Sequence, residues 1–111
     1  MPKRGHLGTF ELMVMLALVR LGDDAYGVTI SREIEDHTGR EVLLGSVYAV
    51  LARLGEKGFV ASRLGNPTRE RGGRAKRYFR ITPKGLRELR EAQRALTALW
   101  KSVPELKGGM A

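Results

Sequence analysis

The most apolar stretch of the chain lies near its N-terminus. Residues 7–21 are rich in helix-forming residues and are apolar almost all round. A helix without a polar face is usually buried on two sides. We therefore predict a helix here, with one side in the core of its own domain and the other against a second surface. Leu12 and Met15 are the candidates for contact with that second surface.

A second helical pattern follows Gly22. Tyr26, Ile30 and Ile34 recur at i, i+4 and i+8, most other positions are polar, and Gly39 is a natural C-terminal stop. The aspartates at positions 23 and 24 precede this pattern, and we expect one of them to cap the N-terminus of the helix.

A third helical pattern spans residues 46–58. Ser46 is the expected N-cap and Gly58 closes the helix. Apolar residues at i, i+3, i+4 and i+7 predict a buried stripe, formed by Val47, Val50, Leu51 and Leu54. The positions outside that stripe are predicted to form an exposed face, which consists of Tyr48, Ala49, Ala52, Arg53 and Glu56.

Two alternating segments, residues 59–64 and 76–82, predict a β-hairpin. The connection between them is about eleven residues long and rich in Gly, Pro and Arg, whereas hairpin loops usually have 2 to 5 residues. A loop of this length commonly has a function of its own. Only Glu70 opposes the cations of residues 68–82, which are Arg69, Arg71, Arg74, Lys76, Arg77 and Arg80.

A last helix is predicted from residue 83. Thr82 is the expected N-cap, and Pro83 suits the first helical position, where its missing N–H costs nothing. Spacings that alternate between three and four residues form a narrow heptad seam, made of Leu86, Leu89, Gln93, Leu96, Trp100 and Val103. Such a seam predicts a dimer interface, in which the polar Gln93 would help to fix the register.

Three helices, a hairpin and a further helix predict an α+β, mainly helical fold, the winged helix-turn-helix. The third helix would be the recognition helix and the hairpin the wing. We expect a DNA-binding domain over residues 1–82, a dimerisation helix over 83–104 packed with it in one compact unit, and a flexible tail over 105–111.

The charge of the chain is concentrated in its second half. The net charge is +8, with seven Lys and Arg against eight Asp and Glu in residues 1–58, but thirteen against four in residues 59–111. A basic half attached to a neutral half is typical of proteins that bind nucleic acid or another anionic surface.

The composition excludes several classes of site. The chain has no Cys, and its two histidines, His6 and His37, do not have the spacing of metal ligands, so we expect no metal and no cofactor. No arrangement of nucleophile, base and acid predicts an enzyme. The longest apolar run, residues 12–19, is too short to span a bilayer, and no signal-peptide cleavage site follows it. We expect an intact cytoplasmic protein without a membrane partner.

Three segments resemble the PadR family of bacterial transcriptional regulators. They are "LGTFELMVMLALVRLGDDAYGVTISREI", "GSVYAVLARLGEKGFV" and "RAKRYFRITPKGLREL", in matching order and spacing. The resemblance covers roughly residues 5–100. Many relatives have a longer C-terminal helical domain, whereas here one helix follows the wing, and the wing is unusually basic.

The resemblance implies a homodimeric repressor whose C-terminal helix mediates dimerisation and packs with the partner's N-terminal helix. It also implies contacts of Tyr26, Ser46 and Tyr48 with the DNA backbone. Because some family members accept flat aromatic effectors between their subunits, it further makes Trp100 a candidate effector contact, beside its interpretation as an anchor of the dimer.

The expected DNA contacts lie on the third helix and the wing. Wing cations would neutralise phosphates, and one of the wing arginines is a candidate for insertion into a narrow minor groove. On the helix, Tyr48 suits a phosphate, and Arg53 suits either a guanine or an intramolecular salt bridge. The complete predicted set is Tyr26, Ser46, Tyr48, Ala49, Arg53, Arg69, Arg71, Arg74, Lys76 and Arg77.

We expect a sequence-specific regulator that binds double-stranded DNA, a homodimeric repressor on a two-fold operator that a signal or small aromatic effector releases. Two alternatives stay open. In the first, basic charge binds nucleic acid without sequence preference. In the second, the heptad seam makes the chain a protein-interaction module.

Overall fold

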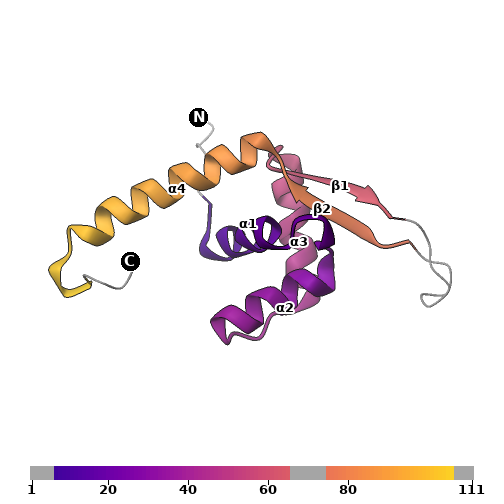
Figure 1. The fold of residues 1–111 in the computed structure, drawn as a ribbon, viewed down its shortest axis with the longest axis horizontal. Helices are drawn as coiled ribbons and strands as arrows, with labels where there is room; N and C mark the ends of the chain where they lie inside the picture. Colours follow the sequence, from indigo (N-terminus) through magenta and orange to yellow (C-terminus); the bar gives the residue numbers. More distant parts are fainter. Residues whose placement is uncertain (1–6, 66–74, 107–111) are drawn as a thin grey trace.

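The chain folds as three helices, a two-stranded hairpin and a fourth helix (Figure 1). The structure, a computed structural model, describes residues 7–65 and 75–106. The helices and strands are α1 Thr9–Leu21, η1 Gly22–Asp24, α2 Gly27–Thr38, α3 Leu44–Glu56, β1 Val60–Leu64, β2 Arg77–Ile81, α4 Pro83–Lys101 and η3 Pro104–Leu106, where η denotes a 3-10 helix. This order confirms the predicted winged helix-turn-helix.

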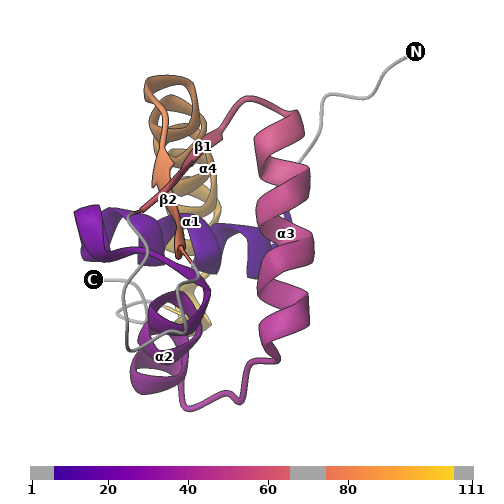
Figure 2. The same ribbon diagram turned by 90° about the vertical axis from the view of Figure 1, so that its right-hand side faces the viewer.

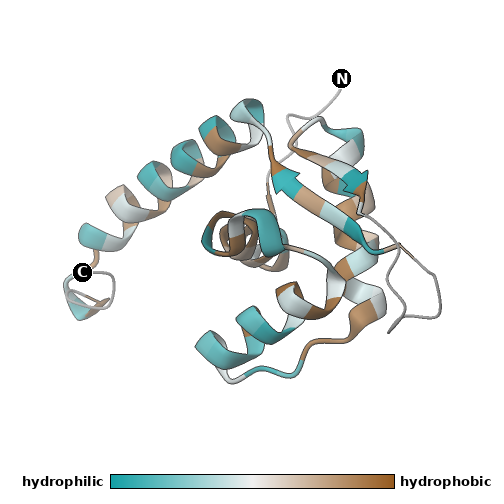
Figure 3. Cartoon of the chain, turned by 45° about the vertical axis from the view of Figure 1, so that its right-hand side comes forward, coloured by the Kyte–Doolittle hydropathy of each residue, from teal (hydrophilic) through white to brown (hydrophobic). Residues whose placement is uncertain are grey.

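α1 occupies the centre of the molecule, with α2, α3 and the hairpin around it (Figure 3). Its Val14 and Met15 are fully buried, as are Ile30 of α2 and Val47 and Leu54 of α3. Because α1 contacts helices on several sides, an almost wholly apolar sequence suits it. The predicted buried stripe of α3 is confirmed, since all four of its residues belong to this core.

Both predicted helix caps before the hairpin are wrong. α2 has Tyr26 at its N-cap position, because the two aspartates are taken up in η1; the Tyr26 N–H donates to Thr29 Oγ1 at 2.9 Å. α3 begins at Leu44, two residues earlier than predicted, with Leu43 at its N-cap position. Ser46 therefore lies inside the first turn of α3, where its N–H donates to the Leu43 carbonyl at 3.0 Å.

β1 and β2 pair antiparallel, with Val60 opposite Ile81 and Leu64 opposite Arg77. The hairpin is attached to the helices at two points. The Phe79 N–H donates to the Ala25 carbonyl, and the Thr82 N–H donates to the Phe59 carbonyl, both at 2.9 Å. These bonds fix the base of the hairpin against the start of α2 and the end of α3. Residues 66–74, the centre of the basic loop, lie outside the described residues.

α4 begins with the predicted cap. Thr82 Oγ1 accepts the Gly85 N–H at 3.0 Å, and Pro83 occupies the first turn. The helix then runs away from the other helices (Figure 1) and ends at Lys101, short of the predicted residue 104. Pro104–Leu106, at the junction with the expected flexible tail, forms the turn η3. Trp100 Nε1 donates to the Leu106 carbonyl at 3.1 Å, so this turn folds back onto the indole.

Gly85 lies where α4 leaves the hairpin, and we expect Gly85→Ala to destabilise the protein. A Cβ at this position would lie 2.2 Å from the Phe59 carbonyl oxygen and 3.0 Å from Ile81 Cγ1. Since a backbone carbonyl cannot move aside as a side chain can, the loss should be about 1–3 kcal/mol, typical of overpacking. Urea unfolding measures it. The control is Gly45→Ala, where a Cβ would meet nothing within 4 Å; equal stability of the two variants would contradict the prediction.

Candidate nucleic-acid interface

The surface of α3 that the core leaves uncovered is the predicted recognition face. α3 stands along one side of the molecule, with the hairpin beside it (Figure 2). Tyr48, Ala49, Ala52 and Arg53 are exposed there, while the opposite side of the helix is buried. Ser46 is also exposed, in the first turn. A helix with one free face is the element that enters the major groove in helix-turn-helix proteins.

Tyr48 lies across the first residue of α2. A Cβ on Gly27 would come within 2.3 Å of the Tyr48 hydroxyl, so only glycine lets the ring lie this close. Tyr48 nevertheless keeps 44% of its surface exposed. The phenol therefore has a position set by packing and a hydroxyl near the outer surface, which suits a fixed contact with a ligand.

The hairpin has two faces because its side chains alternate. Ser62 of β1 and Arg77 and Phe79 of β2 line a hollow against α3. Arg63, Tyr78 and Arg80 line a hollow on the other side, against η1. The cations of the hairpin are thus divided between two environments, and Arg77 shares one with the recognition helix.

An aromatic pair with two cations joins the base of the wing to the start of α2. The rings of Tyr26 and Tyr78 meet edge to face, with centroids 5.5 Å apart. Lys76 Nζ lies 4.2 Å from the centroid of Tyr26, and the Arg63 guanidinium carbon lies 4.8 Å from that of Tyr78. Cations over aromatic faces are attracted by the ring quadrupole. Tyr26 therefore has a packing role at the wing, and its ring is half-buried.

Arg53 forms the salt bridge that was one of its two predicted interpretations. Its Nε lies 3.5 Å from Glu11 Oε2, and Lys57 Nζ lies 3.7 Å from the same oxygen. Glu11 also accepts the Gly8 N–H at 2.8 Å. The Arg53 side chain remains 55% exposed, so the pairing holds the guanidinium at the edge of the recognition face without burying it.

Glu11 is held in its charged form by these neighbours. Burial acts to raise the pKa of Glu11, but the Gly8 amide, Lys57 and Arg53 outweigh it and lower the pKa below the ordinary value of 4.5. A carboxyl whose pKa is lower in the folded than in the unfolded state stabilises the fold above the unfolded pKa. That contribution is lost as the pH falls through the folded pKa.

We therefore expect Glu11→Gln to remove a pH dependence of stability. The parent protein should lose stability on acidification below pH 4.5, the ordinary pKa of Glu11, more steeply than the variant, because only the parent must protonate this paired carboxylate. Urea unfolding at a series of pH values measures the difference. Glu105→Gln, at an exposed position, is the control; parallel curves for the parent and Glu11→Gln would contradict the prediction.

The residues predicted for the dimer interface divide into two groups. Met15 is fully buried and Leu89 is 8% exposed. Both side chains are used by the protomer's own core, so neither supplies a free surface, which corrects their assignment. Leu12, Leu86 and Trp100 are half-buried, and Gln93, Leu96 and Val103 are exposed. The free part of the seam therefore lies in the C-terminal half of α4, where Leu99 is exposed as well.

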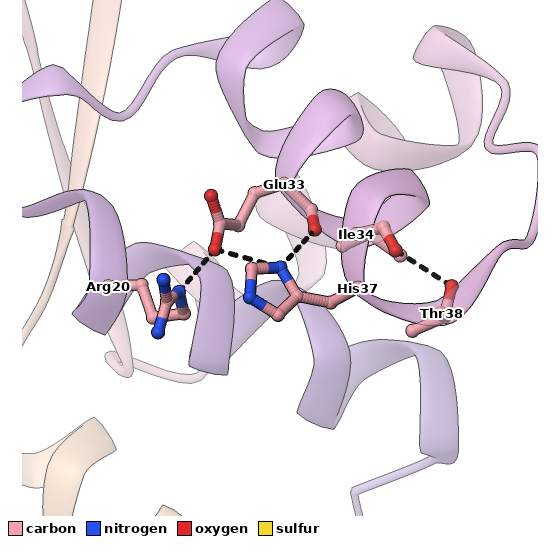
Figure 4. Close-up of polar contacts among 5 residues, drawn as sticks. All are labelled: Arg20, Glu33, Ile34, His37 and Thr38. Carbon is pink, nitrogen blue, oxygen red and sulfur yellow. Dashed lines mark hydrogen bonds and ion pairs between the residues drawn. The ribbon is translucent and has the colours of Figure 1, made fainter.

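The outer side of α1 carries exposed apolar residues that the sequence reasoning did not select. Leu16 and Val19 are exposed, and they line an apolar hollow of about 290 Å³ between α1 and α2. Figure 4 shows its polar rim: Glu33 of α2 pairs with Arg20 of α1 and lies 3.2 Å from His37 Nδ1. Glu33 thus ties α1 to α2 at the edge of this hollow.

Several predicted contacts and sites stay outside this description. Arg69, Arg71 and Arg74 lie beyond the described residues, whereas Lys76 and Arg77 lie within them. Over residues 7–65 and 75–106, no group of three or more His, Asp or Glu side chains could hold a metal ion. In the same part of the chain, no helix is long and apolar enough to cross a membrane.

Three residues of the site were missed by sequence reasoning. Ser62 alternates with the apolar residues of β1, and this period could have placed it on the α3 side. Glu11 interrupts an otherwise apolar helix, which is a signal for a buried ion pair. Nothing local in the sequence indicates that Arg63 lies over Tyr78.

Comparisons with known proteins agree with this geometry. The sequence model of the transcriptional regulator PadR-like family matches residues 15–91. A PadR family transcriptional regulator from Eggerthella lenta is 32% identical, with a TM-score of 0.69 over 86% of this chain and 81% of that one. A putative transcriptional regulator from Thermoplasma acidophilum is 25% identical, with a TM-score of 0.71 over 86% and 87% of the two chains.

One solved structure similar to this chain contains DNA. Bacillus subtilis PadR in complex with operator DNA matches with a TM-score of 0.64 and 20% identity, over 76% of this chain and 47% of that one. At this identity the match supports the fold. The comparison with curated proteins gives no match.

Proposed function

The chain belongs to the PadR-like family of transcriptional regulators, and from this premise we propose that it is a homodimeric repressor of a two-fold operator, released by a signal or small effector. It is a DNA-binding regulator of transcription and not an enzyme. The proposal adds the dimer, the repression and the release. It also places the protein in the cytoplasm, where its DNA lies.

The observation that carries the DNA-binding part is the free face of α3 beside the wing. α3 would enter the major groove, with Ser46, Tyr48, Ala49 and Arg53 as its contacts. Arg53 would contribute to base readout if its guanidinium leaves Glu11, to which only a long ion pair holds it. Tyr26, at the base of the wing, would lie near the flanking backbone.

The wing would provide the sequence-independent part of the affinity. Lys76 and Arg77, together with Arg69, Arg71 and Arg74 of the loop, would neutralise backbone phosphates. Such contacts fix the orientation of a protein on the duplex but carry no sequence information by themselves.

Exposed apolar side chains on α1 and α4 support the dimer. Leu16 and Val19 are 53% and 47% exposed, and Leu96 and Leu99 are 43% and 68% exposed. Apolar residues gathered on two helices mark an interaction surface more often than a solvated one. A two-fold dimer would let α4 of each protomer cover α1 of its partner, because an isologous contact uses each surface twice.

Two such protomers would present two α3 helices to successive major grooves about one helical turn apart. An effector that binds one arrangement of the protomers better than another would shift the spacing of the two helices and weaken the fit to the operator. Repression would then end without any change in α3 itself.

Selection of bound duplexes from random DNA tests the proposed function. A palindromic consensus with half-sites about one turn apart would support it. Binding without any consensus would favour a non-specific nucleic-acid-binding protein, which the concentration of charge in residues 59–111 also fits. No affinity for DNA, together with a stable complex with another protein, would favour an interaction module.

Trp100 tests the effector part of the proposal. Its indole N–H is already taken by the Leu106 carbonyl, so a flat aromatic ligand would bind by stacking on the ring. We expect planar aromatic cations or phenolic acids to quench Trp100 fluorescence saturably and to release the selected DNA. Since Trp100 is the only tryptophan, the signal needs no deconvolution.

The control for this prediction is Trp100→Phe, which keeps an apolar ring in the seam. It should still dimerise but should bind the ligand more weakly. Absence of quenching in the parent at millimolar ligand would leave Trp100 as a packing residue of the dimer.

A further inference from the structure

A groove separates the recognition helix from one face of the wing. It has a volume of about 340 Å³ and is lined by α3 on one side and by both strands of the hairpin on the other. Tyr48 and Ala52 of α3 face Ser62 of β1 and Arg77 of β2 across it. The groove therefore lies between the two elements that a winged helix places against DNA.

Arg77 and Ser62 are arranged as a pair of hydrogen-bond donors. Arg77 Nη1 donates to Ser62 Oγ at 3.1 Å. A guanidinium has five N–H donors, so four remain for another acceptor. Because the Ser62 oxygen accepts from Arg77, its own O–H proton remains available to donate. The two side chains, one from each strand, thus offer positive charge and directed donors from a position fixed by their contact.

The opposite wall provides a third donor and a shallow floor. Tyr48 carries its hydroxyl at the outer surface, held there by its contact with Gly27. Ala52 and Gly55 follow it at spacings of four and three residues on α3 and also line the groove. Their small side chains let an extended backbone approach the helix closely, which a larger side chain at either position would prevent.

The charge of the groove has one sign. Of its lining residues, all within the part of the chain that the structure describes, Arg77 is the one charged residue and none is acidic. The hollow on the other side of the hairpin differs, because Asp23 lines it together with Arg63 and Arg80. An anion would therefore be favoured on the α3 side of the wing and less favoured on the η1 side.

We propose that this groove binds one phosphate of the DNA backbone, with Arg77 and Ser62 of the wing and Tyr48 of α3 as its donors. This inference rests on the proposed DNA-binding function and adds to it a single anchoring site. A phosphate held between α3 and the wing fixes how deep the helix enters the major groove and in which register. Ser62 and Arg77 are then positioning residues for base readout by the rest of α3.

Two arginines of the same strand provide a matched test. Arg77 faces the groove, whereas Arg80 lies opposite Ala61 and lines the other hollow; both are exposed, so either change to alanine should leave the fold intact. Affinity is measured by fluorescence anisotropy against salt, on a random 30-base-pair duplex. Arg77→Ala should reduce the slope of log affinity against log salt by about 0.9, the value of one phosphate contact. Arg80→Ala should leave the slope unchanged.

Neutral linkages locate the contact. Methylphosphonates are placed one at a time in a duplex obtained by selection. The parent should lose affinity about tenfold at one linkage in each half-site, as expected for a hydrogen bond to a charged group. Arg77→Ala should be indifferent to that same linkage. Ser62→Ala and Tyr48→Phe, which each remove one donor, should show a reduced loss there, while Arg80→Ala should behave as the parent.

The outcomes separate the groove from the function. Equal slopes for Arg77→Ala and Arg80→Ala, or a methylphosphonate effect that survives in Arg77→Ala, would overturn the anchoring site while leaving DNA binding in place. Failure of the parent to bind any duplex would overturn the proposed function and the site with it. Thermal unfolding of each variant shows whether a loss of binding reflects a loss of fold.

Discussion

Replacing Arg71, Arg74, Lys76 and Arg77 together with alanine is expected to weaken binding to all DNA sequences by about the same factor. Lys76 lies over the ring of Tyr26 at the base of the wing, and Arg77 lines the groove against α3; the other two belong to the basic loop. Phosphate contacts contribute affinity without reading bases, so the ratio of specific to non-specific affinity should change little.

The salt dependence gives this prediction its magnitude. Each phosphate contact contributes about 0.9 to the slope of log affinity against log salt, so four lost contacts should reduce the slope by about 3.6. Fluorescence anisotropy between low and moderate salt measures it, on the selected operator and on an unrelated duplex.

Net charge must be separated from local contact, and α4 offers the control. Its side away from the seam carries four exposed cations, Arg87, Arg90, Arg94 and Lys101. Their joint replacement by alanine removes the same charge from another part of the molecule. A slope that falls equally in both quadruple variants would show a general effect of charge. A slope unchanged in the wing variant would remove the wing from the DNA backbone.

Leu96→Glu is expected to convert the protein to a monomer. Leu96 is exposed in the protomer at the centre of the free seam, so a carboxylate there leaves the fold intact but would be buried without a partner at the dimer interface. That burial costs several kcal/mol. Since most complexes lose stability through faster dissociation, the variant should sediment as a monomer at micromolar concentration and bind the operator without cooperativity.

The position of the change matters more than its chemistry. Ala98→Glu places the same carboxylate two residues later, on the exposed side of α4 that faces away from the seam, and should leave the dimer unchanged. Leu89→Glu would not test the interface, because Leu89 is buried in the core of the protomer and its change would destabilise the fold. An unchanged sedimentation coefficient for Leu96→Glu would contradict a dimer through this seam.

The positions of the helices and strands could be predicted because they follow from local patterns. The buried stripe of α3, the two strands and the cap of α4 by Thr82 all agree with the periodicity of the sequence. The caps of α2 and α3 could not be predicted in the same way. Leu43 and Tyr26 occupy N-cap positions although neither has a capping side chain, since packing of the helices outweighs the modest energy of a cap.

The recognition face was predicted more completely than the surfaces around it. Tyr48, Ala49 and Arg53 are exposed as expected because the helical period separates them from the buried stripe. The dimer seam was predicted from the same kind of period, yet Leu89 is buried in the protomer and Leu99, outside the seam, is exposed. A heptad pattern shows which residues share a side of a helix, but not which neighbour covers each part of it.

The sequence by itself determined the order of the elements, the basic loop and the residues that line the core, because these depend on residues close together in the chain. Only the tertiary structure decided that Met15 is covered by its own protomer while Leu16 and Val19 are exposed. It also decided that Glu11 meets Arg53 and that Arg77 meets Ser62 beside Tyr48. Those contacts join residues far apart in the sequence, and their distances are set by how the helices and the hairpin pack on α1.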